Sequence, residues 1–235
     1  MKLQYNDVLK AKFLERVNRF RCKIDVNGHI YSAHIHDPGR LSELLKFNSD
    51  VLIRPHTGLN AKTTDFYLFA VNSNDGWVLV DSALHNNIFL WILNSNFIPD
   101  LDGFKIVKRE YKFMDSKYDF LLKSPLGKNC LLEVKGCTLV VDGVAMFPDA
   151  PTVRGMRHVY GLIHALNSGY DSIIVFLITH PGAKIFKPNW IIDEALSKSL
   201  LEAYEADVKI YACKVFLMVY SMSLIWGGLI PVILK

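Results

Sequence analysis

The hydrophobic pattern of this chain changes near Ser82, and that change constrains the fold more than any other feature of its 235 residues. Before this point, short runs rich in β-branched and aromatic residues alternate with turn signals such as Asn27-Gly28, as in strands joined by tight turns. After it, apolar residues from Leu84 to Ile92 recur at helical spacing. The pattern predicts two domains, residues 1–82 and residues 83–235.

The first domain is predicted to be a small β-barrel. The predicted strands are Phe20–Val26, His29–Ile35, Val51–Arg54, Phe66–Asn72 and Trp77–Asp81. Five strands are the number found in an OB-type barrel, a common nucleic-acid-binding fold. The stretch after Gly39 has helical spacing, so we expect a short helix between two of the strands.

The second domain is predicted to be α/β, a mixed (α+β) sheet flanked by helices. The predicted strands are Lys105–Phe113, Lys117–Leu122, Cys130–Lys135, Ser172–Ile178 and Val208–Val215, and the later helices are Thr152–Leu166 and Ile191–Tyr204. A strand, helix, strand order in the second half favours parallel strands joined by crossover helices.

Composition excludes several classes of protein. The four cysteines form no C-x-x-C pair, which argues against a zinc ribbon, and no G-x-G-x-x-G or P-loop motif points to an organic cofactor.

The first twenty residues contain no long apolar segment, so we expect a cytoplasmic protein. The uncharged run Val215–Leu234 is long enough to span a membrane, but Gly227, Gly228 and Pro231 favour two short strands, so no membrane attachment is expected. The formal charge of +4 is compatible with DNA as a partner, and the oligomeric state is left open, a homodimer included.

Charged residues interrupt two apolar strands of the second domain. Asp119 lies in YDFLL, and Glu133 and Lys135 lie in LLEVKG, where strand alternation puts both on one face. Unpaired charges within such strands destabilise the folded protein by several kcal/mol. A bound divalent ion would offset this cost. A surface ion pair would also explain an isolated E-x-K.

A divalent ion is the interpretation that the apolar context favours. Mg²⁺ or Mn²⁺ would be held by Asp119 and Glu133, because such ions take one or two carboxylates and keep several waters. Lys135 would orient a water and hold the attacked phosphate. Glu110, on the preceding strand, either adds a carboxylate near the site or pairs with Lys108 or Arg109. The arrangement resembles the PD-(D/E)xK nuclease motif.

The longer segment around these residues resembles the sugar fermentation stimulation protein A family. The matching residues are Asp119, Glu133, Lys135, Thr138, Leu139, Phe147, Pro148, Asp149, Arg154, Gly155 and His158. A G-R-x-x-E-L-L element at Gly39–Leu45 extends the resemblance into the first half. The chain departs from the family pattern at Asp37-Pro38, at Lys117-Tyr118 and at Thr179–Pro181.

The resemblance implies an N-terminal OB-like domain, a PD-(D/E)xK nuclease-like domain, DNA binding and a metal-dependent nuclease activity. The residues expected to contact nucleic acid are Arg16, Arg19, Arg40, Arg154 and His158. Asp149 is either a further carboxylate near the metal or a turn and cap residue. The alternative to a deoxyribonuclease is a non-catalytic DNA-binding regulator of sugar metabolism genes.

The pair His34 and His36 shares one strand face and invites interpretation as a metal site. No third ligand is evident nearby in the sequence. A packed polar pair or a DNA-facing pair is therefore the preferred interpretation.

Overall fold

The computed structural model describes residues 1–3, 7–56 and 64–235 of the chain. The N-terminal strands are β1 (Leu9–Asn18), β2 (Arg21–Val26), β3 (His29–His34), β4 (Asp50–Pro55), β5 (Phe66–Ser73) and β6 (Gly76–Leu79). They are hydrogen-bonded in the order β3-β2-β1-β4-β5-β6, and a β3–β5 pairing closes β1 to β5 into a five-stranded barrel. The OB-like barrel predicted from the sequence is confirmed.

Two details of the barrel differ from the prediction. β1 is absent from the predicted strands, although Ala11 and Phe13 alternate inward between exposed or half-buried lysines, and β6 extends the sheet outside the closed barrel. The predicted helix after Gly39 is wrong. Residues 42–44 form a turn in which the carbonyl of Leu41 accepts from Leu44 N at 3.1 Å and from Leu45 N at 2.8 Å. Leu41 has a φ of 52°, which an α-helix cannot continue through.

The second half folds around a six-stranded mixed sheet. Its elements are η1 (Ser82–Leu84), α1 (His85–Asn94), η2 (Pro99–Leu101), β7 (Lys105–Phe113), β8 (Ser116–Lys123), β9 (Asn129–Cys137), β10 (Val140–Val141), β11 (Val144–Phe147), α2 (Val153–Asn167), β12 (Asp171–Ile178), β13 (Ile185–Pro188), α3 (Glu194–Glu205), β14 (Lys209–Met218), η3 (Val219–Ser221) and β15 (Ser223–Leu229). The sheet order is β15-β14-β12-β9-β8-β7, and β9, β12 and β14 run parallel. The predicted mixed sheet with flanking helices is confirmed.

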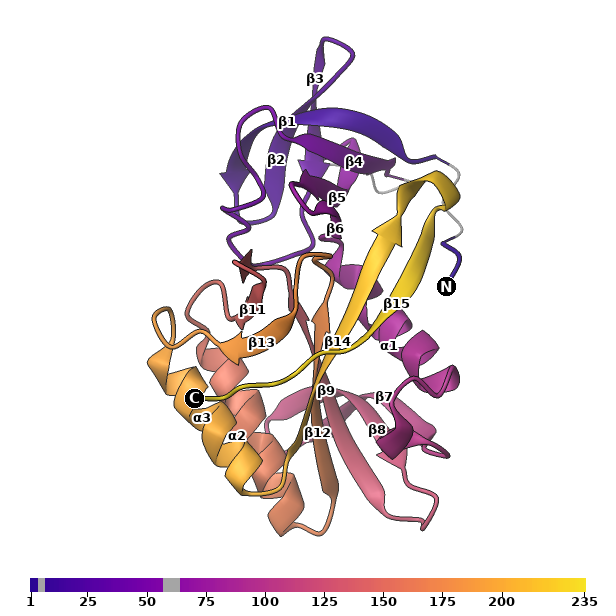
Figure 1. Cartoon of the computed structure of the whole chain (residues 1–235), viewed down its shortest axis with the longest axis vertical. Coiled ribbons are helices and arrows are strands. Elements are labelled where there is room, and N and C mark those ends of the chain that lie inside the picture. Colours follow the sequence, from indigo (N-terminus) through magenta and orange to yellow (C-terminus); the bar gives the residue numbers. More distant parts are fainter. Residues whose placement is uncertain (4–6, 57–63) are drawn as a thin grey trace.

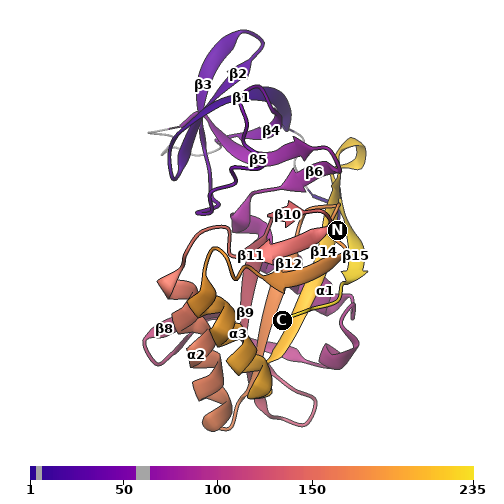
Figure 2. The same cartoon turned by 60° about the vertical axis from the view of Figure 1, so that its left-hand side comes forward.

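Helices cover both faces of this sheet. α2 and α3 lie side by side on one face, and α1 packs on the other (Figures 1 and 2). The core on the α1 side also contains Leu52, Phe69 and Leu79 of the barrel domain, so apolar packing continues from one domain into the other. A further tie is polar, since Thr179 Oγ1 donates to the carbonyl of Leu79 at 2.7 Å.

The apolar C-terminal run does not form one helix. It contains the end of β14, then η3 and β15, which pairs antiparallel with β14. Within residues 1–3, 7–56 and 64–235, no helix is both long and apolar enough to cross a membrane.

Candidate metal and nucleic-acid site

The three residues predicted to carry the chemistry come together on β8 and β9. These strands pair antiparallel with Phe120 opposite Leu132, so Asp119 and Glu133 follow next to each other in the register. Glu133 and Lys135 share a face, and Lys135 Nζ donates a short hydrogen bond to Glu133 Oε1. Leu132 and Val134, between and beside them, face the α1-side core, as strand alternation requires.

Glu133 is the most unusual carboxylate of the group because its side chain is only 4% exposed. Its Oε1 accepts from Lys135 and from His158 Nδ1, the latter at 2.6 Å. Its Oε2 is buried and has no hydrogen-bond partner among the described residues. A buried carboxylate oxygen without a partner is costly, so this atom points to a missing ligand.

The pKa of Glu133 is nevertheless lowered. Burial opposes ionisation, but the charge of Lys135 and the hydrogen bond from His158 together outweigh it. Glu133 is therefore an anion at neutral pH. An anion with a free, buried oxygen is a ligand that a divalent cation would take.

Asp119 is held from two sides. Its Oδ2 accepts from the backbone amide of Val134 at 2.8 Å, and its Oδ1 accepts from Asn86 Nδ2 at 2.9 Å. Burial raises the pKa of Asp119, and the negative charge of Glu133 adds to the shift, against the opposing effect of these hydrogen bonds and of Lys135. A carboxylate whose ionisation is opposed by a neighbouring carboxylate is a further sign of a cation site.

Asn86 is a site residue that sequence reasoning missed. It lies in the first turn of α1, so the helix positions its amide toward β8. The sequence signal was only a polar pair, Asn86-Asn87, at the start of an otherwise apolar helix. Its role depends on how α1 packs against the sheet, which periodicity does not reveal.

The structure places His158, which was expected to contact nucleic acid or to fill a polar pocket, against Glu133. Its side chain is buried and donates from Nδ1 to Glu133, while its Nε2 accepts from Arg154 Nε at 3.5 Å. Its backbone carbonyl accepts from the hydroxyl of Tyr118 at 3.1 Å. His158 is a positioning residue for Glu133. Arg154, exposed in the first turn of α2, remains available to a phosphate.

Glu110 and Asp149 lie apart from this group. Glu110 is exposed and forms an ion pair, but its partner is Lys117 at 3.9 Å and not Lys108 or Arg109. Asp149 Oδ2 accepts from the backbone amides of Arg40 at 2.6 Å and Leu41 at 3.2 Å, so this carboxylate ties the two domains together. Neither residue is bonded to the Asp119 and Glu133 pair in the described part of the chain.

The arginines of the barrel domain divide into two kinds. Arg16 donates to the backbone carbonyls of Arg19, Asp37 and Arg40, and so it holds the loop before the turn rather than presenting a free guanidinium. Arg19 donates to the Pro38 carbonyl at 3.1 Å and remains exposed. The Arg40 side chain is exposed and unpaired within the described residues.

The two histidines predicted to share a strand face, at the end of β3 and just after it, belong to a second polar cluster. His34 and His36 are in edge contact, and His36 Nδ1 lies 2.6 Å from Asp81 Oδ1. Arg54 bonds the other oxygen of Asp81, whose side chain is fully buried. The packed polar pair, not a metal site, fits this arrangement.

No group of three or more histidine, cysteine, aspartate or glutamate side chains within the described residues forms a metal cage. Asp119 and Glu133 fit a different kind of site. Mg²⁺ and Ca²⁺ are hard cations that accept one or two carboxylates and complete their shells with water. The buried, unpartnered Oε2 of Glu133 is the observation that makes the fit.

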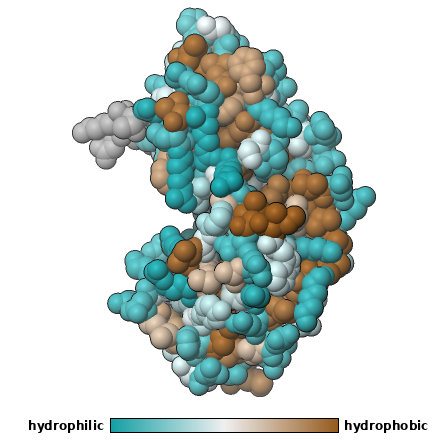
Figure 3. Space-filling model, turned by 90° about the vertical axis from the view of Figure 1, so that its left-hand side faces the viewer, coloured by the Kyte–Doolittle hydropathy of each residue, from teal (hydrophilic) through white to brown (hydrophobic). Residues whose placement is uncertain are grey.

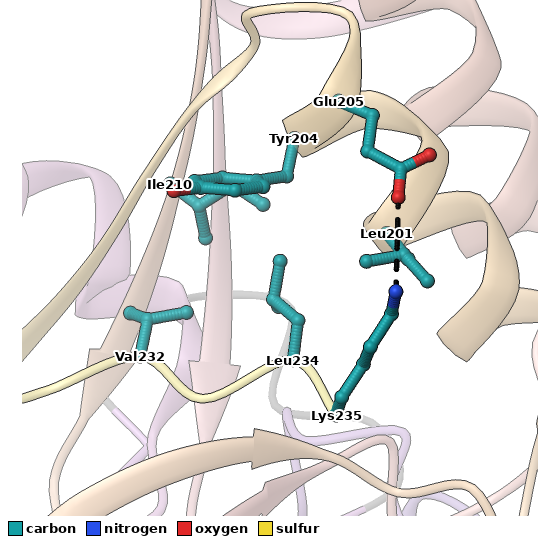
Figure 4. Close-up of a pocket in the computed structure, with 7 residues that line it drawn as sticks. All are labelled: Leu201, Tyr204, Glu205, Ile210, Val232, Leu234 and Lys235. Carbon is teal, nitrogen blue, oxygen red and sulfur yellow. Dashed lines mark ion pairs between the residues drawn. The ribbon is translucent and has the colours of Figure 1, made fainter.

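A separate pocket lies against the C-terminal tail, and none of its lining residues belongs to β8 or β9. Its volume is about 370 Å³, and α3, β14 and the last residues form its walls (Figure 4). The lining residues are Leu201, Tyr204, Glu205, Ile210, Val232, Leu234 and Lys235. Among these, the charged groups Glu205 and Lys235 pair with each other at 4.0 Å.

Known protein families match most of this chain. The family model described as SfsA N-terminal OB domain matches residues 14–80, and the one described as sugar fermentation stimulation protein RE domain matches residues 83–219. The sugar fermentation stimulation protein homolog of Methanothermobacter thermautotrophicus is 44% identical over 86% of this chain and 83% of its own length. The homolog of Caldivirga maquilingensis is 42% identical over 89% of each chain.

A solved structure is similar over almost every residue. It is described as Pyrococcus furiosus SfsA in complex with Ca²⁺, is 31% identical to this chain, covers 99% of both chains, and superposes with a TM-score of 0.91. With both family models matched and these relatives covering most of its length, the chain belongs to the sugar fermentation stimulation protein (SfsA) family.

Proposed function

We propose that this protein binds DNA and hydrolyses its phosphodiester bonds with the help of a divalent ion, Mg²⁺ or Mn²⁺, held by Asp119 and Glu133. The observation that carries the proposal is the buried Oε2 of Glu133, which has no partner among the described residues although Oε1 has two. The Ca²⁺ complex of the Pyrococcus furiosus relative supports a divalent-ion site in the family.

The residues around Glu133 have separable roles in this proposal. A bound ion would polarise the phosphoryl oxygen and make water a better nucleophile. Lys135, 17% exposed at its side chain, reaches the edge of the site and would orient the attacking water and neutralise the phosphate. His158 fixes the carboxylate of Glu133, and Arg154 on the first turn of α2 would contact the phosphate next to it.

The testing experiment is cleavage of labelled DNA with Mg²⁺ or Mn²⁺, by wild type and by Glu133→Gln and Lys135→Met. Loss of one group that acts on the reacting phosphate is expected to slow cleavage by about 100-fold or more. Glu202→Gln, an exposed change on α3, is the matched control and should cut like wild type. Cutting that persists unchanged in Glu133→Gln contradicts the proposal.

A second function is supported by a separate observation. Without an ion, both Asp119 oxygens and Glu133 Oε1 are already hydrogen-bonded, so much of the network is complete by itself. This hydrogen-bond network, without an ion, would be sufficient in a regulator that binds DNA at sugar metabolism genes and does not cut it. Salt-sensitive DNA binding with no fragments in either metal identifies that alternative.

A further inference from the structure

The hairpin of β7 and β8 concentrates positive charge at the edge of the second domain. Residues 105–123 contain six cations and three acids, one of which is Asp119 of the site. The cations are all exposed: Lys105, Lys108, Arg109, Lys112, Lys117 and Lys123. None of them was assigned to nucleic acid by the sequence pattern.

The strand register makes this charge unfavourable for the protein alone. β7 and β8 place Lys105 directly opposite Lys123, and Lys112 directly opposite Lys117. Like charges directly opposite each other on paired strands are destabilising. Of these four lysines, only Lys117 has an acidic neighbour in the described part of the chain, the exposed Glu110 at 3.9 Å. Two repelling pairs with almost no counter-charge are an arrangement that an anionic ligand would stabilise.

The hairpin is joined to the candidate site through α1. Arg109 Nη2 donates to Asn87 Oδ1 at 3.4 Å, and the adjacent Asn86 donates to Asp119. β7 is the outermost strand on this side of the sheet, next to β8, so its outer edge has no neighbouring strand among the described residues. Figure 3 shows the outline of the molecule indented between its upper and lower lobes, with hydrophilic residues on both borders.

We propose that the β7–β8 hairpin binds the sugar-phosphate backbone of duplex DNA and extends the DNA-binding surface beyond the cleavage site. From Lys105 to Lys112 the strand rises about 23 Å, which matches several successive phosphates. The proposal rests on the DNA binding proposed above and adds the surface and the strandedness of the substrate.

The exposed apolar side chains favour duplex over single-stranded DNA. They are aliphatic, namely Ile106, Val107 and Met114, whereas the rings of Tyr111 and Phe113 pack against the α2-side core. Single-strand binders usually supply exposed rings on which bases stack, and this hairpin has none. Its cations fit the outside of a duplex, where phosphates are exposed and bases are not.

A competing explanation needs no ligand. Lysines on an edge strand also hinder pairing with a second protein chain, which protects against aggregation. That role predicts that removal of the lysines changes the association state of the protein and leaves DNA affinity unchanged. The two explanations therefore separate in a binding experiment.

The experiment measures the affinity of the full chain for a labelled duplex and for a single strand of the same sequence, by fluorescence anisotropy across a range of salt concentrations without divalent metal. The test variant changes Lys105, Lys112, Lys117 and Lys123 to Gln. A second variant changes the same four to Arg. The control changes Lys198 and Lys209, exposed residues on α3 and β14, to Gln.

The Gln variant should bind the duplex at least tenfold more weakly than wild type at low salt, with a salt slope smaller by about 0.9 for each phosphate that the hairpin no longer neutralises. The Arg variant and the control should stay within about twofold of wild type, since both keep the hairpin charge. Equal duplex affinity and slope for the Gln variant and the control overturn the inference, as does a weakening confined to the single strand.

Failure of the inference and failure of the proposed nuclease give different results. If the Gln variant binds duplex like wild type while Glu133→Gln still abolishes cutting, the hairpin assignment is wrong and the nuclease stands. If wild type cuts nothing but the hairpin lysines control duplex affinity, the hairpin assignment stands and the regulator alternative is favoured.

Discussion

Two buried carboxylates, Asp81 at the end of the barrel domain and Glu133 on β9, have almost the same surroundings and opposite states of completion. Each lies 2.6 Å from a histidine Nδ1, His36 for Asp81 and His158 for Glu133. Each also pairs with one cation, Arg54 or Lys135. Burial opposes ionisation at both, and in both the histidine and the cation outweigh it, so both pKa values are lowered.

The difference lies in the second oxygen. Asp81 Oδ1 takes His36 and the amide of Ala83, and Oδ2 takes Arg54, so both oxygens are satisfied. Glu133 Oε2 has no partner in the described structure. A complete network of this kind stabilises the junction between barrel and α1, whereas an incomplete one stores unfavourable free energy that a ligand relieves. Burial and charge alone therefore do not distinguish the two carboxylates, whereas the unpartnered oxygen of Glu133 does.

Removal of the Asp81 charge should have the largest effect on stability. Asp81→Asn removes the anion that Arg54 and His36 share at a fully buried position, so we expect a loss of about 3–5 kcal/mol. Urea unfolding measures it. DNA cleavage per folded molecule should be unchanged at a temperature where the variant is folded, and a specific loss of cleavage there would place Asp81 in the site.

Without metal, Glu133→Gln should lower the free energy of unfolding by less than Asp81→Asn does. It should also remove the stabilisation by metal that is expected for wild type. Lys135 is partly exposed and can turn to water, so we expect a loss of about 2 kcal/mol. Mn²⁺ or Ca²⁺, at a concentration about one hundred times the Kd of the ion, should raise the free energy of unfolding of wild type by about 2.7 kcal/mol. The same concentration should leave that of the variant almost unchanged. Thermal unfolding with and without metal checks this, with Asp81→Asn as the variant that must keep the gain.

Asp119→Asn should leave the metal-free protein as stable as wild type or slightly more stable. Burial and the charge of Glu133 raise the pKa of Asp119, so its ionised form is held at a cost at neutral pH. Asparagine keeps an oxygen for the Val134 amide. The expected gain is below about 1 kcal/mol. A large loss in metal-free urea unfolding would show that Asp119 is structural.

The pH dependence should separate the two acidic residues of the site by sign. Glu133 has a pKa below its ordinary value of 4.5, so its contribution is complete above that pH and is lost as pH falls through the lower folded value. Asp119 has a pKa above its ordinary value of 3.8, so its cost is present at neutral pH and disappears as pH falls toward 3.8. At neutral pH, Glu133→Gln should be less stable than wild type, and Asp119→Asn should be as stable or slightly more stable. Both differences in the free energy of unfolding should become smaller as the pH is lowered from about 7 to about 3.

Much of the second domain was predictable because its elements have strong local patterns. α2 begins with Thr152 as its N-cap, where the Oγ1 accepts from Gly155 N at 3.0 Å, and β12 is apolar without interruption from Ile173 to Ile178. β1 was missed because its inward positions alternate with lysines that resemble a solvated segment. The helix predicted after Gly39 failed because the left-handed conformation of Leu41 and the contact of its amide with Asp149 are set by the other domain.

The candidate site was predictable only in part. Asp119, Glu133 and Lys135 stood out as charges within apolar strands, and strand alternation placed Glu133 and Lys135 on one face. The hydrogen bond of His158 to Glu133 was not foreseen, because a position on a helix face does not reveal which side of the sheet the helix covers. The Asn86 hydrogen bond and the unpartnered oxygen of Glu133 depend on packing between elements far apart in sequence.

The sequence by itself determined most of the strands and helices, the family and the residue types that meet at the edge of β8 and β9, because these follow from local periodicity and from motifs along the chain. The tertiary structure decided which charges are satisfied. Asp149 became a tie between domains, His158 a support for Glu133, and the lysines of β7 and β8 opposed each other across a hairpin. Whether a polar atom has a hydrogen-bond partner depends on the relative positions of distant segments to within a few tenths of an ångström. The order of the residues along the chain does not contain these positions.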